Sequence, residues 1–226
     1  MNATVFPPPP ATLAPVAGTD DRFPVRRIFC VGRNYAAHRA EMGGDDREPP
    51  FFFSKPADAL VPSGAVIPYA RATTDLHHEV ELVIAIGTGG ADIPVKDALN
   101  HVYGYAVGVD LTRRDLQAAA KAKGQPWDSA KAFDQSAPVG AIVAGPGADW
   151  QGGIRLFVNG EPRQAAQLSQ MIWSVPEIIA ECSRLWRLAP GDLIFTGTPE
   201  GVGPLEAGDG VRAVIDGLPE LAFTIA

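Results

Sequence analysis

The chain has 226 residues, of which 46% are hydrophobic and 20% charged, and its formal net charge is −7 at pH 7. This composition excludes a disordered or fibrous chain. The acidic balance, without a basic stripe, argues against a nucleic-acid partner, because phosphate binding needs clustered lysine and arginine. We expect a proline-rich arm over residues 1–25 and one catalytic domain over residues 26–226.

The first residues predict neither a signal peptide nor a membrane span, because they lack a basic segment followed by a continuous apolar run. Pro7 to Pro10 predict an extended polyproline segment that lies on the body of the protein. Cys30 and Cys182 both fall within apolar runs. They favour reduced, buried thiols and therefore a cytoplasmic location.

Short strands dominate the first half of the chain. The run RRIFCVG predicts a strand ending at Gly32, followed by a short helix or turn, NYAAHRAEM. Proline places the runs PFFFSKP and ALVPSGAVIP at sheet edges. Two further strands are expected, one within HHEVELVIAIG and one ending at Asp110, with a helical turn VKDALN between them. A helix then begins at Thr112 as its N-cap and ends at Gly124.

The second half continues in the same way. The runs AIVAG and IRLFVNGEPRQ predict strands, with a hairpin turn at Asn159-Gly160. Ser174 and Glu177 form a capping box that opens a helix with an apolar stripe. Strands and glycine turns alternate to the end of the chain. The many short strands and few helices predict a β-rich α+β fold.

Three carboxylates form the candidate metal site. Glu79 and Glu81 are two residues apart on a predicted strand, so both point to one face, and Asp110 ends the next strand. Three oxygen donors without a cysteine or histidine cluster favour Mg²⁺ or Mn²⁺ over zinc. Alternating glutamates are also common on the solvated face of an antiparallel strand, so this pair alone is a weak signal.

His38 and Glu41 are the candidate proton-transfer pair. Three residues apart on a helical turn, they share a face, and the carboxylate could orient the imidazole to take a proton from water. A plain surface pair is the alternative. Lys131 lies among small and aromatic residues, which favours a partly buried ammonium that binds an anion, although most lysines extend to the surface.

Three further side chains are candidates for substrate binding. Arg114 and Gln117 lie on the first turns of the helix after Asp110 and could bind a carboxylate or carbonyl group; Arg113 is the alternative that periodicity leaves open. Thr198 belongs to the run GTPEGVGP, whose backbone N–H groups could cradle an anion or simply form a tight turn.

The chain from about Arg26 onwards resembles the fumarylacetoacetate hydrolase family, in its small, single-domain acylpyruvate hydrolase branch. The resemblance rests on six ordered motifs: CVGRNYAAHRAEMG, FFFSKP, HHEVELVIAIG, YGYAVGVDLTRRDLQ, KAFDQSAP and GDLIFTGTPEGVG. It implies a rolled, mixed β-sheet and a homodimer. Within that branch the chain looks most like bacterial hydrolases that cleave fumarylpyruvate in aromatic-acid breakdown.

The resemblance also implies roles for the candidate residues. Glu79, Glu81 and Asp110 would hold Mg²⁺ or Mn²⁺, His38 and Glu41 would activate water on a lid over the substrate, and Lys131 would stabilise developing negative charge. The implied substrate is a 2,4-diketo acid, whose polar groups Arg114, Gln117 and Thr198 would hold. Its C3–C4 bond breaks to give a carboxylic acid and pyruvate enolate. Oxaloacetate decarboxylation passes through the same enolate, and a 2-oxo acid isomerase or hydratase is a further alternative.

Overall fold

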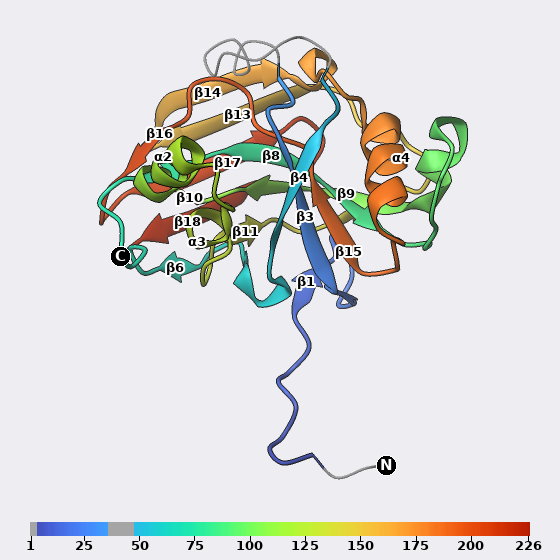
Figure 1. Cartoon of the computed structure of the whole chain (residues 1–226), viewed down its shortest axis with the longest axis horizontal. Helices are drawn as coiled ribbons and strands as arrows, with labels where there is room; N and C mark the ends of the chain where they lie inside the picture. Colours follow the sequence, from blue (N-terminus) through green and yellow to red (C-terminus); the bar gives the residue numbers. More distant parts are fainter. Residues whose placement is uncertain (1–3, 36–47) are drawn as a thin grey trace.

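The computed structural model describes residues 4–35 and 48–226. A mixed sheet of eight strands curls through this part of the chain (Figure 1), in the order β4, β3, β15, β8, β9, β11, β5, with β12 paired to β9. Its strands are β3 (Arg27–Gly32), β4 (Phe51–Lys55), β5 (Leu60–Pro62), β8 (Val80–Ile86), β9 (Val102–Val109), β11 (Ala137–Val139), β12 (Val143–Ala144) and β15 (Asp192–Phe195). The pairs β3–β15 and β5–β11 are parallel and the other pairs are antiparallel.

A five-stranded sheet packs against the first one. It runs in the order β14 (Glu161–Gln167), β13 (Gly153–Val158), β17 (Gly210–Ile215), β18 (Leu221–Ile225), β6 (Val66–Ile67). Strands β13 and β17 contact β8 and β9 of the larger sheet. Asn159 and Gly160 turn the β13–β14 hairpin with φ of 53° and 85°, the two positive values that the Asn-Gly pair predicts.

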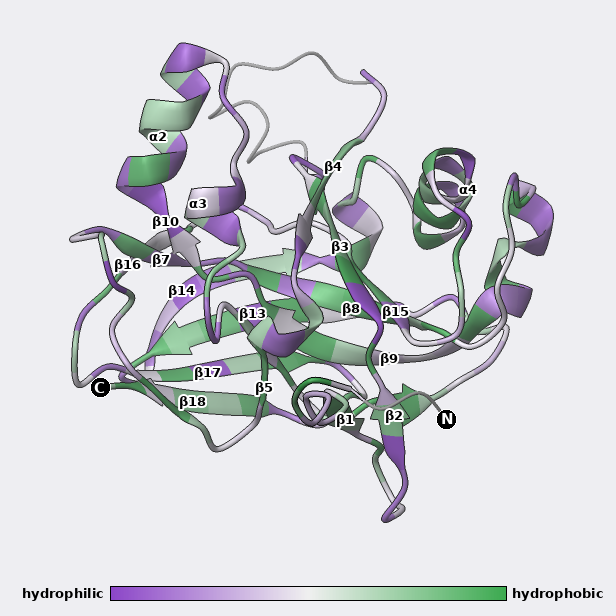
Figure 2. Cartoon of the chain, turned by 60° about the horizontal axis from the view of Figure 1, so that its bottom comes forward, coloured by the Kyte–Doolittle hydropathy of each residue, from purple (hydrophilic) through white to green (hydrophobic). Residues whose placement is uncertain are grey.

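Strand β8 is buried on both faces, which explains its nearly continuous apolar sequence. Leu82 and Ile84 belong to the core between the two sheets. Val83 and Ala85 face the other way, into a second core that the N-terminal hairpin covers. Figure 2 shows hydrophobic residues predominating along β9 and β17, whereas hydrophilic and hydrophobic residues alternate along α2. Because β8 is central in the sheet, the residues at its start are held rigidly inside the protein.

A three-stranded sheet and the helices complete the domain. The small sheet has the order β10 (Thr112–Arg113), β7 (Leu76–His78), β16 (Gly203–Leu205). The helices are α2 (Arg114–Lys123), α3 (Asp128–Lys131) and α4 (Val175–Leu185), with 3₁₀ turns η1 (Ala57–Ala59), η2 (Val95–His101) and η3 (Leu168–Gln170). The expected capping box opens α4, since Ser174 N–H donates to Glu177 Oε2 at 2.9 Å. The β-rich α+β prediction, with its rolled mixed sheet, is confirmed.

The predicted start of the helix after Asp110 is wrong. Thr112 is not its N-cap but a buried residue of β10, and α2 begins at Arg114. Pairing with β7 keeps the backbone of Thr112 and Arg113 extended, which moves the N-cap of the helix by one residue, from Thr112 to Arg113. The expected end is confirmed, because Gly124 has the left-handed conformation with φ of 63°.

The N-terminal segment has two parts. Strands β1 (Leu13–Pro15) and β2 (Arg22–Pro24) form a hairpin whose Ala14, Val16 and Phe23 enter the second core. Residues 4–11 are exposed, and Figure 1 shows them running away from the domain. The prediction that the prolines lie on the body is wrong, because neither Val5, 99% exposed, nor Phe6, 70% exposed, anchors the segment. No helix within the described residues has the length and apolar character needed to cross a membrane.

Candidate active site

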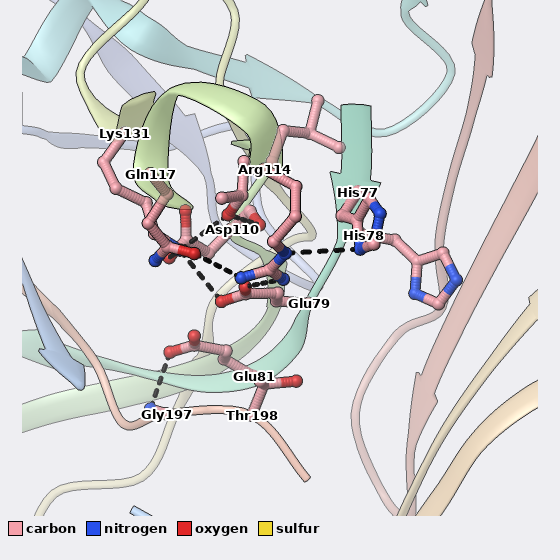
Figure 3. A network of polar contacts seen from close by, with 12 residues as sticks. His77, His78, Glu79, Glu81, Asp110, Arg114, Gln117, Lys131, Gly197 and Thr198 are labelled. Atoms are coloured by element: carbon pink, nitrogen blue, oxygen red, sulfur yellow. Dashed lines mark hydrogen bonds and ion pairs between the residues drawn. The ribbon is translucent and has the colours of Figure 1, made fainter. Parts of the chain in front are cut away.

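The three predicted metal ligands meet where β8 begins and β9 ends. Antiparallel pairing sets Val80 opposite Val109, and Asp110 N–H donates to the Glu79 carbonyl at 2.8 Å. Glu79 and Glu81 flank Val80, so their side chains emerge on the same side of the chain. Carboxylate oxygens of Glu79, Glu81 and Asp110 all lie within 4.8 Å of one another (Figure 3). The sequence pattern therefore located a genuine acidic cluster, and the solvated-face alternative is excluded because all three residues are buried.

The burial of these carboxylates has an electrostatic consequence. Removal from water, together with the like charges of Asp110 and Glu79, raises the pKa of Glu81 well above its usual range. One oxygen of Glu81 accepts a hydrogen bond from Gly197 N–H at 2.6 Å, which works in the opposite direction. A cation placed among the three groups would relieve this repulsion.

Lys131 supplies one such cation, and it is more deeply buried than expected. Its ammonium donates to Glu79 Oε2 at 2.9 Å, Asp110 Oδ2 at 2.6 Å and Thr112 Oγ1 at 2.6 Å. Burial works to lower the pKa of Lys131, but the carboxylates of Asp110 and Glu79 outweigh it and raise that pKa above its usual value. Lys131 is therefore a charged ammonium at neutral pH, held against the acidic cluster.

The cluster also fits a divalent cation. All its donors are carboxylate oxygens, the ligands of hard ions such as Mg²⁺ and Mn²⁺. Asp110 Oδ1 is buried without a hydrogen bond, although the ammonium of Lys55 lies 2.8 Å away as an ion-pair partner. The cations of Lys131, Lys55 and Arg114 contact Glu79 and Asp110, whereas the described contacts of Glu81 include none of them. Glu81 and Asp110 therefore keep carboxylate oxygens that can bind a divalent cation.

The structure distinguishes the two arginines that the sequence left open. Arg114 turns into the site: it donates to Glu79 Oε1 at 2.5 Å, to His77 Nδ1 at 3.3 Å, and to Gln117 Oε1 (Figure 3). Arg113 instead donates to the Ser129 carbonyl at 3.0 Å. One small pocket is lined by both glutamates and by Arg114, Gln117, Lys131 and Thr198. The candidate substrate-binding residues are thus brought together.

Thr198 and Gly197 belong to the loop between β15 and β16. Gly197 has φ of 95°, and a Cβ added there would lie 2.7 Å from Asn34 Cβ, so glycine is required. Its N–H points at Glu81 rather than at an open anion cradle. The loop therefore orients a carboxylate of the protein, and Thr198, 3% exposed, lines the pocket beside it.

A larger cavity of about 460 Å³ adjoins this pocket. Both are lined by Phe53, Trp127 and Lys131, so the acidic cluster opens towards an aromatic wall. The rings of Phe51 and Trp127 meet edge to face, with centroids 5.2 Å apart. This space could accommodate the part of a substrate that extends away from the carboxylates.

Four residues remain in the comparison between the sequence-based predictions and the structure: two were predicted and two were not. His38 and Glu41 lie outside the described residues, so their pairing stays a prediction. Lys55 was not proposed, although it ends the largely apolar run FFFSK. Gln164 was not proposed either. It is 2% exposed, yet nothing in its local sequence distinguishes it from a surface glutamine of an edge strand.

The curled mixed sheet and the buried carboxylate cluster with its lysine are typical of a divalent-metal-dependent enzyme acting on small anions. Residues 27–226 match the family model described as "Fumarylacetoacetate (FAA) hydrolase C-terminal". The chain belongs to this family, as its motifs predicted.

Three relatives illustrate the range of the family. A fumarylpyruvate hydrolase from Pseudomonas aeruginosa, solved in complex with Mn²⁺ and pyruvate, is 50% identical and has a TM-score of 0.96, with 99% of each chain covered. A fumarylpyruvate hydrolase from Ralstonia sp is 44% identical over 79% of this chain and 93% of its own. The mitochondrial oxaloacetate tautomerase FAHD1 of Mus musculus is 43% identical over 88% of this chain and 91% of its own.

Proposed function

We propose that this protein hydrolyses a C–C bond in an acylpyruvate, with fumarylpyruvate as its substrate and fumarate and pyruvate as its products. The observation that carries this proposal is the buried acidic cluster of Glu79, Glu81 and Asp110. Its two glutamates line one pocket with Lys131 and Arg114, and Lys131 also binds Asp110. The two fumarylpyruvate hydrolases support the choice of substrate, since one matches the whole fold at 50% identity.

The metal in this proposal is Mg²⁺ or Mn²⁺, held by the three carboxylates. When bound, such an ion supplies charge neutralisation for a 2-oxo acid and for the negative charge that develops as its carbon–carbon bond breaks. Support comes from the oxygen-only donor set and from the Mn²⁺ and pyruvate in the Pseudomonas aeruginosa relative.

The side chains around the cluster take complementary roles. Arg114, Gln117 and Thr198 hold the polar groups of the 2,4-diketo acid, since they line the pocket beside the carboxylates. Water adds to the C4 carbonyl, the C3–C4 bond then breaks, and the electron pair stays on the pyruvate fragment as its enolate. The Lys131 ammonium stabilises that charge. A proton then reaches C3 and completes pyruvate.

His38 and Glu41 are assigned to water activation in this proposal. His38 takes the proton from the attacking water, because an imidazole titrates near neutral pH, and Glu41 stabilises the resulting imidazolium. The assignment rests on their spacing and on their place in the family motif GRNYAAHRAEMG. It makes hydrolysis, rather than isomerisation, the expected reaction.

Oxaloacetate chemistry is the second candidate. The Mus musculus relative, 43% identical, is named an oxaloacetate tautomerase. Oxaloacetate carries the same 2-oxo acid group beside the position where the enolate forms. Decarboxylation or tautomerisation would therefore use the same carboxylate cluster and Lys131, without a water held over the C4 carbon.

The test is pyruvate release from fumarylpyruvate, acetylpyruvate and oxaloacetate, measured side by side with Mg²⁺, with Mn²⁺ and after chelation. Fastest metal-dependent turnover of fumarylpyruvate is the expected result. Preference for oxaloacetate, or an absorbance change of its enol form without pyruvate release, would replace the proposal with the second candidate. Absence of turnover on all three would overturn both.

We also propose a cytoplasmic homodimer. The exposed Val5 and Phe6 of the projecting segment support a second copy as their partner, and the two free, buried cysteines support a reducing compartment. Light scattering on the eluting protein should give about twice the 23.8 kDa chain mass. A monomeric mass would overturn the dimer, and recovery of the protein outside the cytoplasmic fraction of its host would overturn the location.

A further inference from the structure

Gln164 reaches from the second sheet into the wall of the candidate active site. It lies on β14, and its amide oxygen accepts from Val80 N–H at 3.1 Å and contacts His78 Nδ1 at 3.0 Å. Its amide nitrogen donates to Thr198 Oγ1 at 2.8 Å and to the Pro199 carbonyl at 2.9 Å. One buried side chain thus joins the start of β8, where the carboxylates emerge, to the loop that carries Thr198.

Two backbone partners fix which end of the amide faces which way. Val80 N–H can only donate, so the atom beside it must be the amide oxygen. The Pro199 carbonyl can only accept, so the atom beside it must be the amide nitrogen. Turning the amide over would set two donors against each other and two acceptors against each other. The orientation therefore follows from the backbone alone.

This orientation determines the direction of the Thr198 proton. The Gln164 amide nitrogen has no lone pair to offer, so Thr198 Oγ1 must be the acceptor in their contact. The hydroxyl hydrogen then points elsewhere, and among the described residues it has no acceptor. Thr198 is 3% exposed and lines the pocket that contains Glu79, Arg114 and Lys131. Thr198 therefore keeps an unused hydroxyl donor in the lining of the pocket where a substrate would bind.

We infer that Gln164 is a positioning residue that presents the Thr198 hydroxyl as a hydrogen-bond donor to an oxygen of a bound 2-oxo acid. This inference rests on the proposed function, because it takes a 2-oxo acid as the ligand of the pocket. Gln164 acts by occupying the hydroxyl oxygen, which keeps the proton free, and by holding Pro199 in place through its carbonyl.

The experiment uses Gln164→Glu, Thr198→Val and the double variant, with Gln164→Met as a neutral second variant. A glutamate at this position would accept the Thr198 proton and so turn it away from the ligand. Its negative charge would also repel an anion directly, but that effect is the same in both Thr198 backgrounds. The difference between the effects of Gln164→Glu on pyruvate binding in the Thr198 and Thr198→Val backgrounds therefore measures the contribution of the hydroxyl.

The probe is pyruvate binding to the Mn²⁺-loaded protein by calorimetry, with Mn²⁺ affinity, KM and kcat measured in parallel. Thr198→Val should weaken pyruvate binding about tenfold, the effect of losing a hydrogen bond to a charged ligand. Gln164→Glu should weaken it about tenfold more in the Thr198 background than in the Thr198→Val background. Mn²⁺ affinity should change little, and Gln151→Met, at an exposed glutamine, should leave pyruvate binding unchanged.

Equal effects of Gln164→Glu in the two backgrounds would overturn the inference and leave Gln164 as a purely structural anchor. If Gln164→Glu does not fold, Gln164→Met decides in the same way: it should weaken pyruvate binding only where Thr198 is present. The wild-type protein could fail to turn over fumarylpyruvate while Gln164→Glu still weakens pyruvate binding more in the Thr198 background than in the Thr198→Val background. That result would support this inference and overturn the proposed function. If fumarylpyruvate is turned over normally but Gln164→Glu weakens pyruvate binding equally in both backgrounds, only the inference is overturned. A wild-type protein that binds no pyruvate would overturn both the inference and the proposed function.

Discussion

The ammonium of Lys55 lies 2.8 Å from Asp110 Oδ1, and neither side chain is exposed to solvent. Lys55 comes from the edge strand β4, whereas Asp110 follows the inner strand β9. The same ammonium donates to the carbonyls of Leu111, at 3.0 Å, and Lys131, at 2.5 Å. Lys55 therefore holds the backbone on both sides of the acidic cluster as well as one of its carboxylates.

Replacing Lys55 should destabilise the protein strongly. In Lys55→Met the Asp110 carboxylate loses a buried partner and two backbone carbonyls lose their donor, which should reduce the free energy of unfolding by about 3 kcal/mol. Denaturant unfolding of the metal-free protein at pH 7 measures this. Lys96→Met, at an exposed lysine, should change stability by less than about 0.5 kcal/mol. If Lys55→Met reduced the free energy of unfolding no more than Lys96→Met does, the buried ion pair would be unimportant for stability.

Gly197 should be required for the site and not only for the fold. Gly197→Ala forces a φ of 95° on alanine and a clash with Asn34, and it displaces the N–H that holds Glu81. Gly208→Ala has nearly the same backbone strain, with φ of 94°, but nothing lies within 4 Å of the added Cβ. We expect Gly208→Ala to cost about 1 kcal/mol of stability and Gly197→Ala about 3 kcal/mol.

Mn²⁺ binding separates the two glycine variants further. Titration followed by electron paramagnetic resonance should show weakened binding in Gly197→Ala only, because only Gly197 touches a carboxylate of the cluster. Equal Mn²⁺ affinities in Gly197→Ala and Gly208→Ala would mean that the Gly197 N–H does not orient Glu81 for metal.

Metal binding and water activation, the two proposed parts of the site, should respond to different mutations. Glu81→Gln changes a proposed metal ligand and should weaken Mn²⁺ binding by more than the roughly 10–100-fold typical of residues that only support ligands. Hydrolysis should disappear with it. His38→Ala should abolish hydrolysis but leave Mn²⁺ affinity within a few-fold of wild type, because His38 is assigned to water. Wild-type hydrolysis in His38→Ala would remove the histidine from the mechanism.

The acidic cluster was predictable because it depends on local geometry. Two-residue alternation places Glu79 and Glu81 together, and simple pairing of consecutive strands brings Asp110 beside them. Lys55 and Gln164 were not predicted, since their partners are distant in the sequence: Leu111 is 56 residues from Lys55, and Thr198 and Val80 are 34 and 84 residues from Gln164. No periodicity encodes such contacts. His38 and Glu41 stay predictions from their spacing and from family resemblance.

Periodicity could not decide between Arg114, the predicted residue, and Arg113, its alternative, for a different reason. A helix that started at Thr112 would give both arginines places in its first turn, and periodicity could not separate them. The backbone instead stays extended through β10, and α2 begins at Arg114. Strand pairing with β7, a tertiary contact, overrides the local capping signal of Thr112 and decides which arginine enters the pocket.

Asp115 should make the first turn of α2 sensitive to acid. Burial alone would raise its pKa, but the Thr73 hydroxyl, at 2.6 Å, and the N–H groups of Leu116 and Thr74 outweigh it and lower that pKa. A carboxylate with a lowered folded-state pKa stabilises the protein above its unfolded pKa of about 3.9. That stabilisation is lost as the pH falls through the folded-state value.

Asp115→Asn should therefore be less stable than wild type at pH 7, by a modest amount because Asp115 is only partly buried. The difference should shrink as the pH is lowered below about 4, because the unfolded wild-type chain then binds a proton that the folded carboxylate does not, and it should vanish only below the lowered folded-state pKa. Urea unfolding at a series of pH values measures both curves, with Asp20→Asn, at an exposed loop aspartate, as the control. A stability difference between wild type and Asp115→Asn that stays constant from pH 7 to pH 3 would show that the hydrogen bonds of Asp115 do not depend on its charge.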